Sequence, residues 1–377
     1  MNLQDFDYVI VGAGLFGAVI AERIANDLNQ PVLVIEKRTH TGGNCHSEVH
    51  AETGIEYHKY GTHIFHTSNK AVWDYFRRFT DINGYFHQVL TTYKNRVYQM
   101  PINLETINQF YEKNLKPYEV EEFLDVERAK EVYDEPASFE EQAINFVGRP
   151  LYEAFLKGYT EKQWGRSPRE ISASVLKRLP FRANYSETYY FDQYQGIPLD
   201  GYGAIFDRML ASRNIELLLN TDYFEIKNEL KEKALVVYSG EIDRLFSYKH
   251  GDLEYRTLEF EFETVNVEDY QGTSVMNYAE LDVRYTRIHE PKHLHPERAH
   301  SPDKTLIIRE YSKACHRSEP YYPIGGERNR ELYQKYKNEL KAMHNLIVGG
   351  RLGDYRYYDM HHVIEAALSI YEERIKK

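Results

Sequence analysis

The chain has 377 residues, 42% of them hydrophobic and 28% charged, which is enough for several domains and excludes a disordered protein. Its formal net charge of −11 argues against nucleic acid as a partner, because nucleic-acid binders present basic faces. Two cysteines are too few for a disulfide framework, and neither a signal peptide nor a long apolar run is evident, so we expect a cytoplasmic protein without a membrane span.

The first residues predict a β-α-β unit. Tyr8–Val11 and Pro31–Ile35 are short apolar runs typical of buried parallel strands, and Leu15–Leu28 has helical periodicity between them. The turn before the helix reads Gly12-Ala13-Gly14-Leu15-Phe16-Gly17, and Glu36 ends the second strand. This arrangement is typical of a Rossmann-type dinucleotide site.

Each glycine of this turn has a physical reason. Gly12 permits the tight turn, Gly14 lets a diphosphate approach the backbone, and Gly17 lets helix and strand pack closely. Glu36 is placed to accept hydrogen bonds from a ribose. The glycine pair in Gly42-Gly43-Asn44 follows closely, which favours FAD over NAD.

The middle of the chain predicts an acidic, helical domain over residues 101–175. Candidate helices lie at 104–113, 118–133, 138–146 and 151–157. The segment 165–182 contains Gly165, Pro168, Pro180 and scattered charge, so we expect it to be exposed, with a mobile lid over 165–180.

Alternating apolar and polar residues predict an antiparallel sheet later in the chain. The alternation covers residues 258–265, 275–278, 285–289 and 305–310. We assign residues 181–204 and 236–340 to this substrate domain, and residues 1–100 with the returning segments 205–235 and 340–377 to the nucleotide-binding domain. The predicted fold class is α/β with α+β insertions: a Rossmann-type FAD-binding domain, a helical domain and a twisted antiparallel sheet.

Six sequence blocks, in order along nearly the whole chain, resemble bacterial UDP-galactopyranose mutases. They read HKYGTHIFHT at 58–67, GYTEKQW at 158–164, RLP at 178–180, YTRIHE at 285–290, EPYYP at 319–323 and GRLGDYRYYDM at 350–360.

The resemblance implies a flavin-dependent isomerase that interconverts UDP-galactopyranose and UDP-galactofuranose for galactofuranose-containing surface polysaccharide. Only reduced FAD would be active, its N5 would attack the anomeric carbon, and no net redox change would occur. NAD(P)H or another reductant would charge the flavin, and we expect a homodimer, as is common in the family.

The resemblance also implies the residues of the site. A diphosphate needs fixed cations, which forked guanidinium groups supply well. The implied catalytic residues are Arg178, Arg287, His66 and Asp359. The implied substrate-binding residues are Phe155, Tyr159, Thr160, Trp164, Tyr189, Asn277, Tyr322 (with Tyr321 as its competitor) and Tyr357. The cofactor-binding residues are Gly12, Gly14, Phe16, Gly17, Glu36, Lys37, Arg38, Gly43, Asn44, His63, Ile64, Arg351, Tyr358, Asp359 and Met360.

Two features of the block at 58–67 need separate comment. His63 and His66 have a spacing that metal sites use, but no third ligand is evident, so we expect no metal. Thr62 stands where many family members carry proline, near the implied sugar pocket, which leaves the acceptance of a UDP-N-acetylgalactosamine-like substrate open.

Two alternatives share the dinucleotide motif. An FAD amine-oxidase-like enzyme would need no diphosphate clamp, and a non-catalytic nucleotide-binding regulator would need neither Trp164 nor Asp359. Turnover of the nucleotide sugar only by the reduced protein would support the mutase over both.

Overall fold

A five-stranded parallel sheet begins the fold and carries the predicted β-α-β unit. The computed structural model describes residues 2–173, 176 and 181–376. The strand order is β16-β10-β1-β2-β9, and every neighbouring pair is parallel. These strands are β1 (Tyr8–Val11), β2 (Val32–Ile35), β9 (Ile215–Leu218), β10 (Leu235–Tyr238) and β16 (Leu346–Val348).

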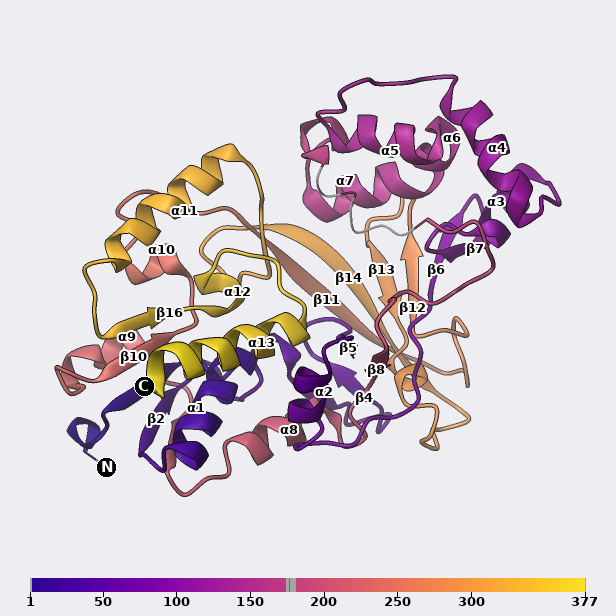
Figure 1. The fold of residues 1–377 in the computed structure, drawn as a ribbon. Coiled ribbons are helices and arrows are strands. Elements are labelled where there is room, and N and C mark those ends of the chain that lie inside the picture. The colour runs from indigo at the N-terminus through magenta and orange to yellow at the C-terminus, as the bar shows by residue number, and fades with distance from the viewer. Residues whose placement is uncertain (1, 174–175, 177–180, 377) are drawn as a thin grey trace.

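Both faces of this sheet are covered, as its continuous apolar strands require. On one face Ile10 and Val34 pack against three helices, and Figure 1 shows two of these, α1 and α13, lying side by side. On the other face Val9 and Leu33 pack against residues of the connections after β9 and β10. The helices of the first face are α1 (Leu15–Asp27), α8 (Gly201–Met209) and α13 (Met360–Ile370).

A second sheet has seven strands in the order β15-β11-β14-β13-β12-β6-β7. Its pairs are antiparallel, as predicted, except that β12 and β6 run parallel. Its strands are β6 (Val89–Tyr93), β7 (Arg96–Met100), β11 (Tyr255–Val265), β12 (Val275–Tyr278), β13 (Arg287–His289), β14 (Thr305–Cys315) and β15 (Tyr322–Pro323).

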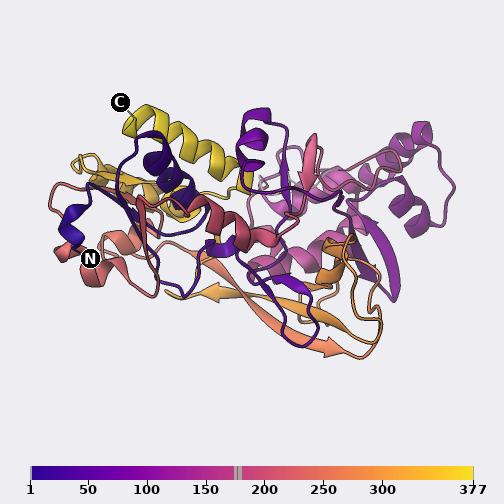
Figure 2. The ribbon, with the colours of Figure 1, turned by 90° about the horizontal axis from the view of Figure 1, so that it is seen from below.

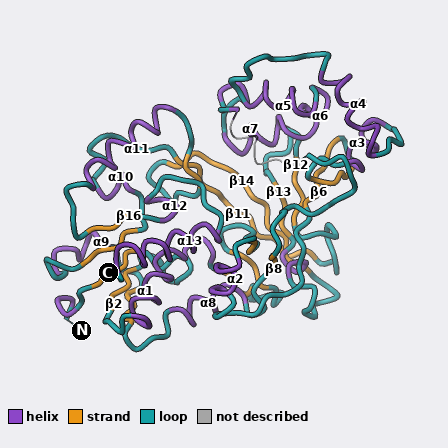
Figure 3. Tube along the Cα trace, viewed as in Figure 1, coloured by secondary structure: helices purple, strands orange, loops and turns teal. Residues whose placement is uncertain are grey.

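The predicted helices of the middle segment form their own apolar core, which includes Leu124, Phe139 and Tyr152. Figure 3 shows them at one end of the molecule, with strands of the larger sheet between them and the parallel sheet. They are α3 (Leu104–Tyr111), α4 (Pro117–Arg128), α5 (Phe139–Val147), α6 (Arg149–Leu151), a π-helix (Tyr152–Lys157) and α7 (Gly158–Trp164).

Short elements complete the described chain, and Figure 2 shows both termini at the end that holds the parallel sheet. The remaining helices are α2 (Lys70–Phe76), α9 (Tyr223–Ile226), α10 (Ile242–Leu245), α11 (Glu327–Leu340), α12 (Gly350–Gly353), 3-10 turns at Leu3–Asp5, Gly43–Cys45, Pro168–Glu170, Lys227–Glu229 and Pro291–Leu294, and a π-turn at Tyr371–Ile375. β3 (Ser47–Val49) and β4 (Glu56–His58) form a small hairpin, and β5 (Phe65–Thr67) pairs with the distant β8 (Tyr194–Gly196) in a second two-stranded antiparallel sheet.

Three placements differ from the sequence-based expectation. Residues 89–100 form β6 and β7 of the larger sheet, where β6 pairs with β12, rather than joining the nucleotide-binding part. Residues 236–238 belong to β10 of the parallel sheet, because a short apolar run does not reveal whether its partners are parallel or antiparallel. Ile171 and Leu176, in the segment expected to be exposed, are buried in the core of the helical part.

Among the helices of the described residues, none combines the length and apolar character that a membrane crossing needs.

Candidate functional site

The main cleft lies where all five parallel strands end. Gly12 follows β1, Glu36 follows β2, Ser239 follows β10 and Gly350 follows β16, while Thr221 stands shortly after β9; all five residues line the cleft. Ligands of open parallel sheets bind at this carboxyl edge. Together with the solvent space at its open mouth, the cleft has a volume of about 1670 Å³.

The glycine turn is shaped for a diphosphate. Gly12 has a φ of +101°, and a Cβ there would lie 2.3 Å from the Ser239 Oγ. A Cβ on Gly17 would lie 2.0 Å from the Gly12 carbonyl oxygen, so Gly17 allows helix packing and does not itself line the cleft. Gly14 caps the N-terminus of α1, whose free N–H groups and dipole favour an anion.

Glu36 is held in place by the backbone. One carboxylate oxygen accepts a hydrogen bond of 2.9 Å from the Ala13 N–H, and the other accepts one of 2.9 Å from the Arg38 N–H. Glu36 is only 5% exposed, yet each oxygen has capacity for a further donor. This geometry fits the ribose-binding role predicted from the sequence, and the neighbouring glycine turn fits the diphosphate of the same ligand.

The cleft contains almost every residue that the sequence suggested for the cofactor. Of that set the cleft is lined by Gly12, Gly14, Phe16, Glu36, Lys37, Arg38, Gly43, Asn44, His63, Ile64, Arg351, Tyr358, Asp359 and Met360.

Sequence reasoning missed the wall built by the loops after β9 and β10. Asp222 forms an ion pair with Arg244, whose guanidinium lies 4.8 Å from the centre of the Phe224 ring, and all three line the cleft. The signal was available: polar residues directly after two short apolar runs mark the carboxyl ends of parallel strands.

Another part of the cleft lining combines Arg287 and Glu310 with tyrosines. Arg287, on β13, donates a hydrogen bond to the Tyr159 hydroxyl from helix α7. Its Nε lies 3.2 Å from Glu310 Oε1, an ion pair without hydrogen-bond alignment. Burial opposes the charge of Arg287, but Glu310 keeps its pKa above the ordinary value. The rings of Tyr322 and Tyr357 stack at 5.8 Å beside it, and both line the cleft.

The structure brings some of the implied substrate residues near Arg287 and places others in a hydrophobic core. Tyr189 contacts the rings of His87 and Tyr190, and Asn277 lies opposite Arg287 in the β12–β13 register. Phe155 is 3% exposed and belongs to the core of the helical part, where its ring lies 4.9 Å from that of Tyr98.

The remaining implied substrate residues lie on α7 or outside the description. Thr160 is buried, and Trp164 lines a second hollow together with Arg166 and Arg256. Arg178 lies outside the residues that the structure describes, as do the other parts of the predicted lid at 174–175, 177 and 179–180.

Lys162 is a positioning residue that the sequence did not single out. Its ammonium donates to the carbonyl oxygens of Tyr278, Glu280, Val283 and Tyr285, at 2.7 to 3.0 Å. The Tyr278 carbonyl ends β12, and the other three belong to the connection between β12 and β13. Lys162 therefore ties the helix that carries Tyr159 to the strand that carries Arg287.

The two histidines of the block at 58–67 do not share a ligand position. The Nδ1 of His63 lies 2.6 Å from the Gly61 carbonyl oxygen, whereas the Nδ1 of His66 lies 2.6 Å from Asp192 Oδ2. His66 instead approaches Asp359 and His361, with possible ligand atoms of all three within 4.8 Å of one another. The sequence revealed no further potential ligand beside the two histidines. In the structure two such groups lie near His66, namely His361 on α13 and Asp359 directly before that helix.

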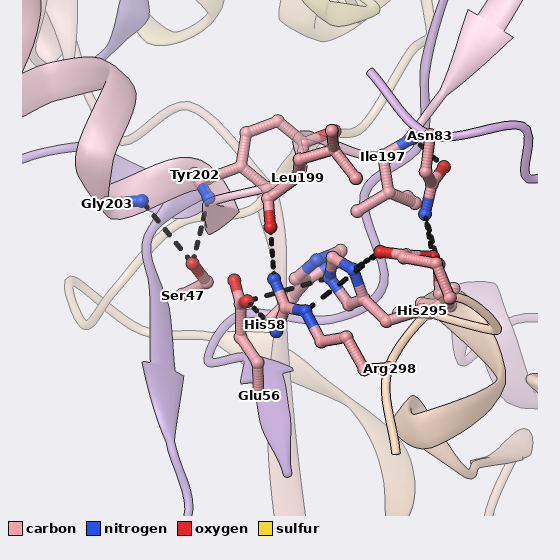
Figure 4. Close-up of polar contacts among 12 residues, drawn as sticks. Ser47, Glu56, His58, Asn83, Ile197, Leu199, Tyr202, Gly203, His295 and Arg298 are labelled. Atoms are coloured by element: carbon pink, nitrogen blue, oxygen red, sulfur yellow. Dashed lines mark hydrogen bonds and ion pairs between the residues drawn. The ribbon is translucent and has the colours of Figure 1, made fainter. Parts of the chain in front are cut away.

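A buried polar cluster behind the cleft fixes the segment that carries Thr62 and His63 (Figure 4). Glu56 accepts a hydrogen bond of 2.7 Å from Arg298. The Nδ1 of His58 accepts one of 2.9 Å from the His63 N–H, while the His58 ring packs edge-on against Tyr202 at 5.1 Å. Segments 56–63, 199–203 and 295–298 are thereby held together, so the cleft wall is supported from behind.

The imidazole rings of His63 and His87 are kept neutral in the folded protein, which makes its free energy of unfolding depend on pH. Burial lowers the pKa of His63 to about 4, with Arg351 acting in the same direction, and burial with Arg287 lowers that of His87 to about 3. Histidine in an unfolded chain has a pKa of about 6.5. Between the folded and unfolded pKa values the unfolded chain binds more protons than the folded protein, so the free energy of unfolding falls as the pH falls.

We therefore expect urea unfolding to show a smaller acid loss in His87→Phe. Between pH 7 and pH 5 this variant should lose about 1–2 kcal/mol less free energy of unfolding than the wild type. Exposed His344→Gln serves as the control and should behave like the wild type. An equal loss in His87→Phe and the wild type would contradict the buried neutral ring.

Comparisons with known proteins agree with this geometry. Residues 154–357 match the family model described as UDP-galactopyranose mutase, and residues 10–79 match the one described as NAD(P)-binding Rossmann-like domain. The chain is 42% identical to a Klebsiella pneumoniae protein named "Probable UDP-galactopyranose mutase", over 98% of this chain and 95% of that protein. It is 40% identical to the dTDP-fucopyranose mutase of Escherichia coli, over 98% of both.

A solved structure gives the same fold at lower sequence identity. A reduced UDP-galactopyranose mutase superposes with a TM-score of 0.73 and 16% identity, covering 96% of this chain and 94% of that chain. This likeness concerns the fold: a Rossmann-type part combined with further helices and sheets.

Proposed function

The chain belongs to the UDP-galactopyranose mutase family and is a flavin-dependent isomerase, and from this premise we propose that it binds FAD and interconverts UDP-galactopyranose and UDP-galactofuranose. One observation carries the proposal: the dinucleotide turn lines a single cleft together with Arg287, Tyr322 and Tyr357. A cofactor held by the turn therefore lies within reach of a nucleotide sugar held by these three residues.

The residues present fit FAD at the parallel sheet. Gly12 and Gly14 leave the backbone open for a diphosphate, and Glu36 offers carboxylate oxygens to a ribose. Arg351, Tyr358 and Met360 line the same cleft and would help to hold the flavin. When bound, a reduced flavin supplies an electron-rich nitrogen that can act as a nucleophile.

The chain's own residues would act on the sugar nucleotide. Arg287 would bind the diphosphate and stabilise the charge on UDP as it leaves the sugar, which is electrostatic catalysis. The Tyr159 hydroxyl and Glu310 orient the guanidinium. Neutral His63, whose Nδ1 lies against the Gly61 carbonyl oxygen, would present Nε2 as an acceptor. We extend the proposal to Arg178 and the lid from the family resemblance alone.

Several partners follow from the same proposal. NAD(P)H or another reductant would charge the flavin, the product would serve galactofuranose-containing surface polysaccharide, and the working unit would be a homodimer in the cytoplasm. Both cysteines are free, which is consistent with a reducing compartment.

A second candidate substrate comes from the comparisons. The Escherichia coli relative named dTDP-fucopyranose mutase is nearly as similar as the relative from Klebsiella pneumoniae. The two names differ in base and in sugar, so this chain's preference within nucleotide sugars needs a direct test. The amine-oxidase alternative loses its support, because the near full-length relatives are mutases.

The test is to incubate the reduced protein with UDP-galactofuranose and, separately, with dTDP-fucofuranose, and to separate the products by chromatography. We expect UDP-galactopyranose to form with the higher kcat/KM. Faster conversion of the dTDP sugar would move the assignment to the second candidate. Oxygen consumption with an amine, and no sugar conversion, would overturn the mutase proposal.

Glu36→Gln tests the ribose contact of the proposed FAD site. The exchange replaces an acceptor oxygen by an amide that faces backbone donors, so we expect FAD to bind more weakly by roughly 1.5–3 kcal/mol. That corresponds to a dissociation constant roughly 10-fold to 150-fold higher, measured by titrating the apoprotein with FAD. Glu216→Gln, on the exposed side of β9, is the control. An unchanged dissociation constant in Glu36→Gln would exclude the assigned role.

A further inference from the structure

A chain of polar side chains joins Thr62 to Arg287. The Thr62 Oγ1 lies 2.7 Å from His289 Nδ1, and His289 Nε2 lies 3.0 Å from Glu310 Oε2. The other oxygen of Glu310 forms the 3.2 Å ion pair with Arg287. His289 and Glu310 are each 2% exposed, whereas Thr62, Glu310 and Arg287 all line the cleft. Thr62, at which the chain departs from the family pattern, is therefore connected through His289 and Glu310 to Arg287, the proposed diphosphate-binding residue.

The strands make this chain rigid. Arg287 and His289 lie two residues apart on β13, so their side chains share one face of the sheet. Glu310 lies directly opposite Arg287 in the pairing of β13 with β14. Glu310 also accepts a hydrogen bond of 3.3 Å from the Thr286 hydroxyl. The links of Glu310 to Arg287 and His289 are thus set by the register of two paired strands, and Thr62 joins them from the segment between β4 and β5.

The chemistry of the partners assigns the hydrogens. Burial opposes the charge of Glu310, but Arg287 and the His289 ring hold the pKa of this carboxyl below its ordinary value, so the group is an acceptor only. The His289 Nε2 must then carry the hydrogen that points at Glu310. Burial lowers the pKa of His289, so the ring is neutral and its Nδ1 is an acceptor. The Thr62 hydroxyl must therefore donate its single hydrogen to Nδ1.

This assignment leaves the cleft side of Thr62 with lone pairs only. We propose that Thr62 is a specificity-determining residue that accepts a hydrogen bond from one hydroxyl group of the sugar, with His289 and Glu310 as positioning residues. The inference rests on the proposed function, because it requires a nucleotide sugar in this part of the cleft. A sugar without that hydroxyl would leave the Thr62 oxygen without a donor on binding, which disfavours it.

The first test removes the oxygen but keeps the shape. Thr62→Val should lower kcat/KM for UDP-galactose roughly threefold to tenfold, the value of one neutral hydrogen bond, and should leave the FAD dissociation constant unchanged. Thr62→Ser keeps the hydroxyl and should remain near the wild type. Thr264→Val, on the exposed end of β11 where Thr264 bonds to Glu52, makes the same change outside the cleft and should have no effect.

The second test pairs the variants with UDP-galactose analogues that lack one sugar hydroxyl each. We expect one deoxy analogue to react with the wild type as slowly as UDP-galactose reacts with Thr62→Val. The kcat/KM for that analogue should be the same in Thr62→Val as in the wild type, since both partners of the same hydrogen bond are then absent.

A separate measurement, the discrimination against the deoxy analogue, tests the proposed positioning role of His289. His289→Leu removes both ring nitrogens, so the wild-type discrimination against that deoxy analogue should shrink, whereas His289→Gln keeps a donor and an acceptor and should restore it. In the Thr62→Val background neither His289 variant should change the discrimination. A purely structural role for His289 would lower activity on every analogue equally.

Three results would overturn the inference. The first is an unchanged kcat/KM of Thr62→Val for UDP-galactose. The second is equal discrimination between UDP-galactose and the deoxy analogue by the wild type and Thr62→Val. The third is a loss of kcat/KM in Thr62→Val that is explained by weaker FAD binding. A wild-type protein that binds UDP-galactose without converting it would instead refute the proposed function. In that case the same comparison, made with dissociation constants, still decides the role of Thr62.

Discussion

Arg287→Ala should lower kcat/KM for the nucleotide sugar by about 30-fold to several thousand-fold, while the protein keeps its flavin. The half-buried guanidinium lies between Tyr159 and Glu310 and lines the cleft. Its removal takes away the diphosphate partner and also leaves Glu310 without its cation. Truncating one partner of a buried charged pair costs about 2–5 kcal/mol, which is the source of the expected range.

Two further variants make this result specific. Arg287→Lys keeps the charge but loses the fork that matches a phosphate, so it should recover only part of the activity. Arg309→Ala, on the neighbouring strand, removes an arginine that pairs with Glu261 and Glu263, and should stay close to the wild type. The flavin absorbance spectrum and the Tm of each variant serve as folding controls. Activity of Arg287→Ala within a few-fold of the wild type would remove Arg287 from the diphosphate site.

The second large effect concerns the redox state. Protein with oxidised flavin should show no measurable isomerisation, and one treatment with dithionite or NAD(P)H under anaerobic conditions should start many turnovers per flavin. The reason is that substrate and product stand at the same oxidation level, so the reaction consumes no electrons, whereas only the reduced flavin offers a nucleophilic nitrogen.

The measurement is the amount of sugar converted for each equivalent of reductant added. The ratio should rise far above one and continue to rise with time. Consumption of one reductant for each sugar converted, or full activity of the oxidised protein, would show that the flavin has a different role. Arg287→Ala provides the control for flavin reduction, since its flavin should be reduced normally although its turnover is low.

The predictions from sequence succeeded where the signal is local. The strands at 8–11, 32–35, 258–265 and 275–278 were all expected from periodicity, and the structure confirms them. The glycine turn and Glu36 were also expected, because their roles depend on residues close by in the chain. Parallel pairing of β9 and β10 with β1 and β2 was harder to foresee, since short apolar runs look alike in both kinds of sheet.

The same distinction holds within the site. The amino-acid sequence by itself determined the dinucleotide turn, the residues of the family blocks and the presence of an arginine at 287. Only the tertiary structure decided that the Tyr159 hydroxyl meets Arg287, that Phe155 packs in a core, and that Thr62 reaches Glu310 through His289. The physical reason is distance along the chain: periodicity reports a residue's neighbours within a few positions, whereas Thr62 and His289 are 227 residues apart and meet only because the tertiary fold places the segment between β4 and β5 against β13.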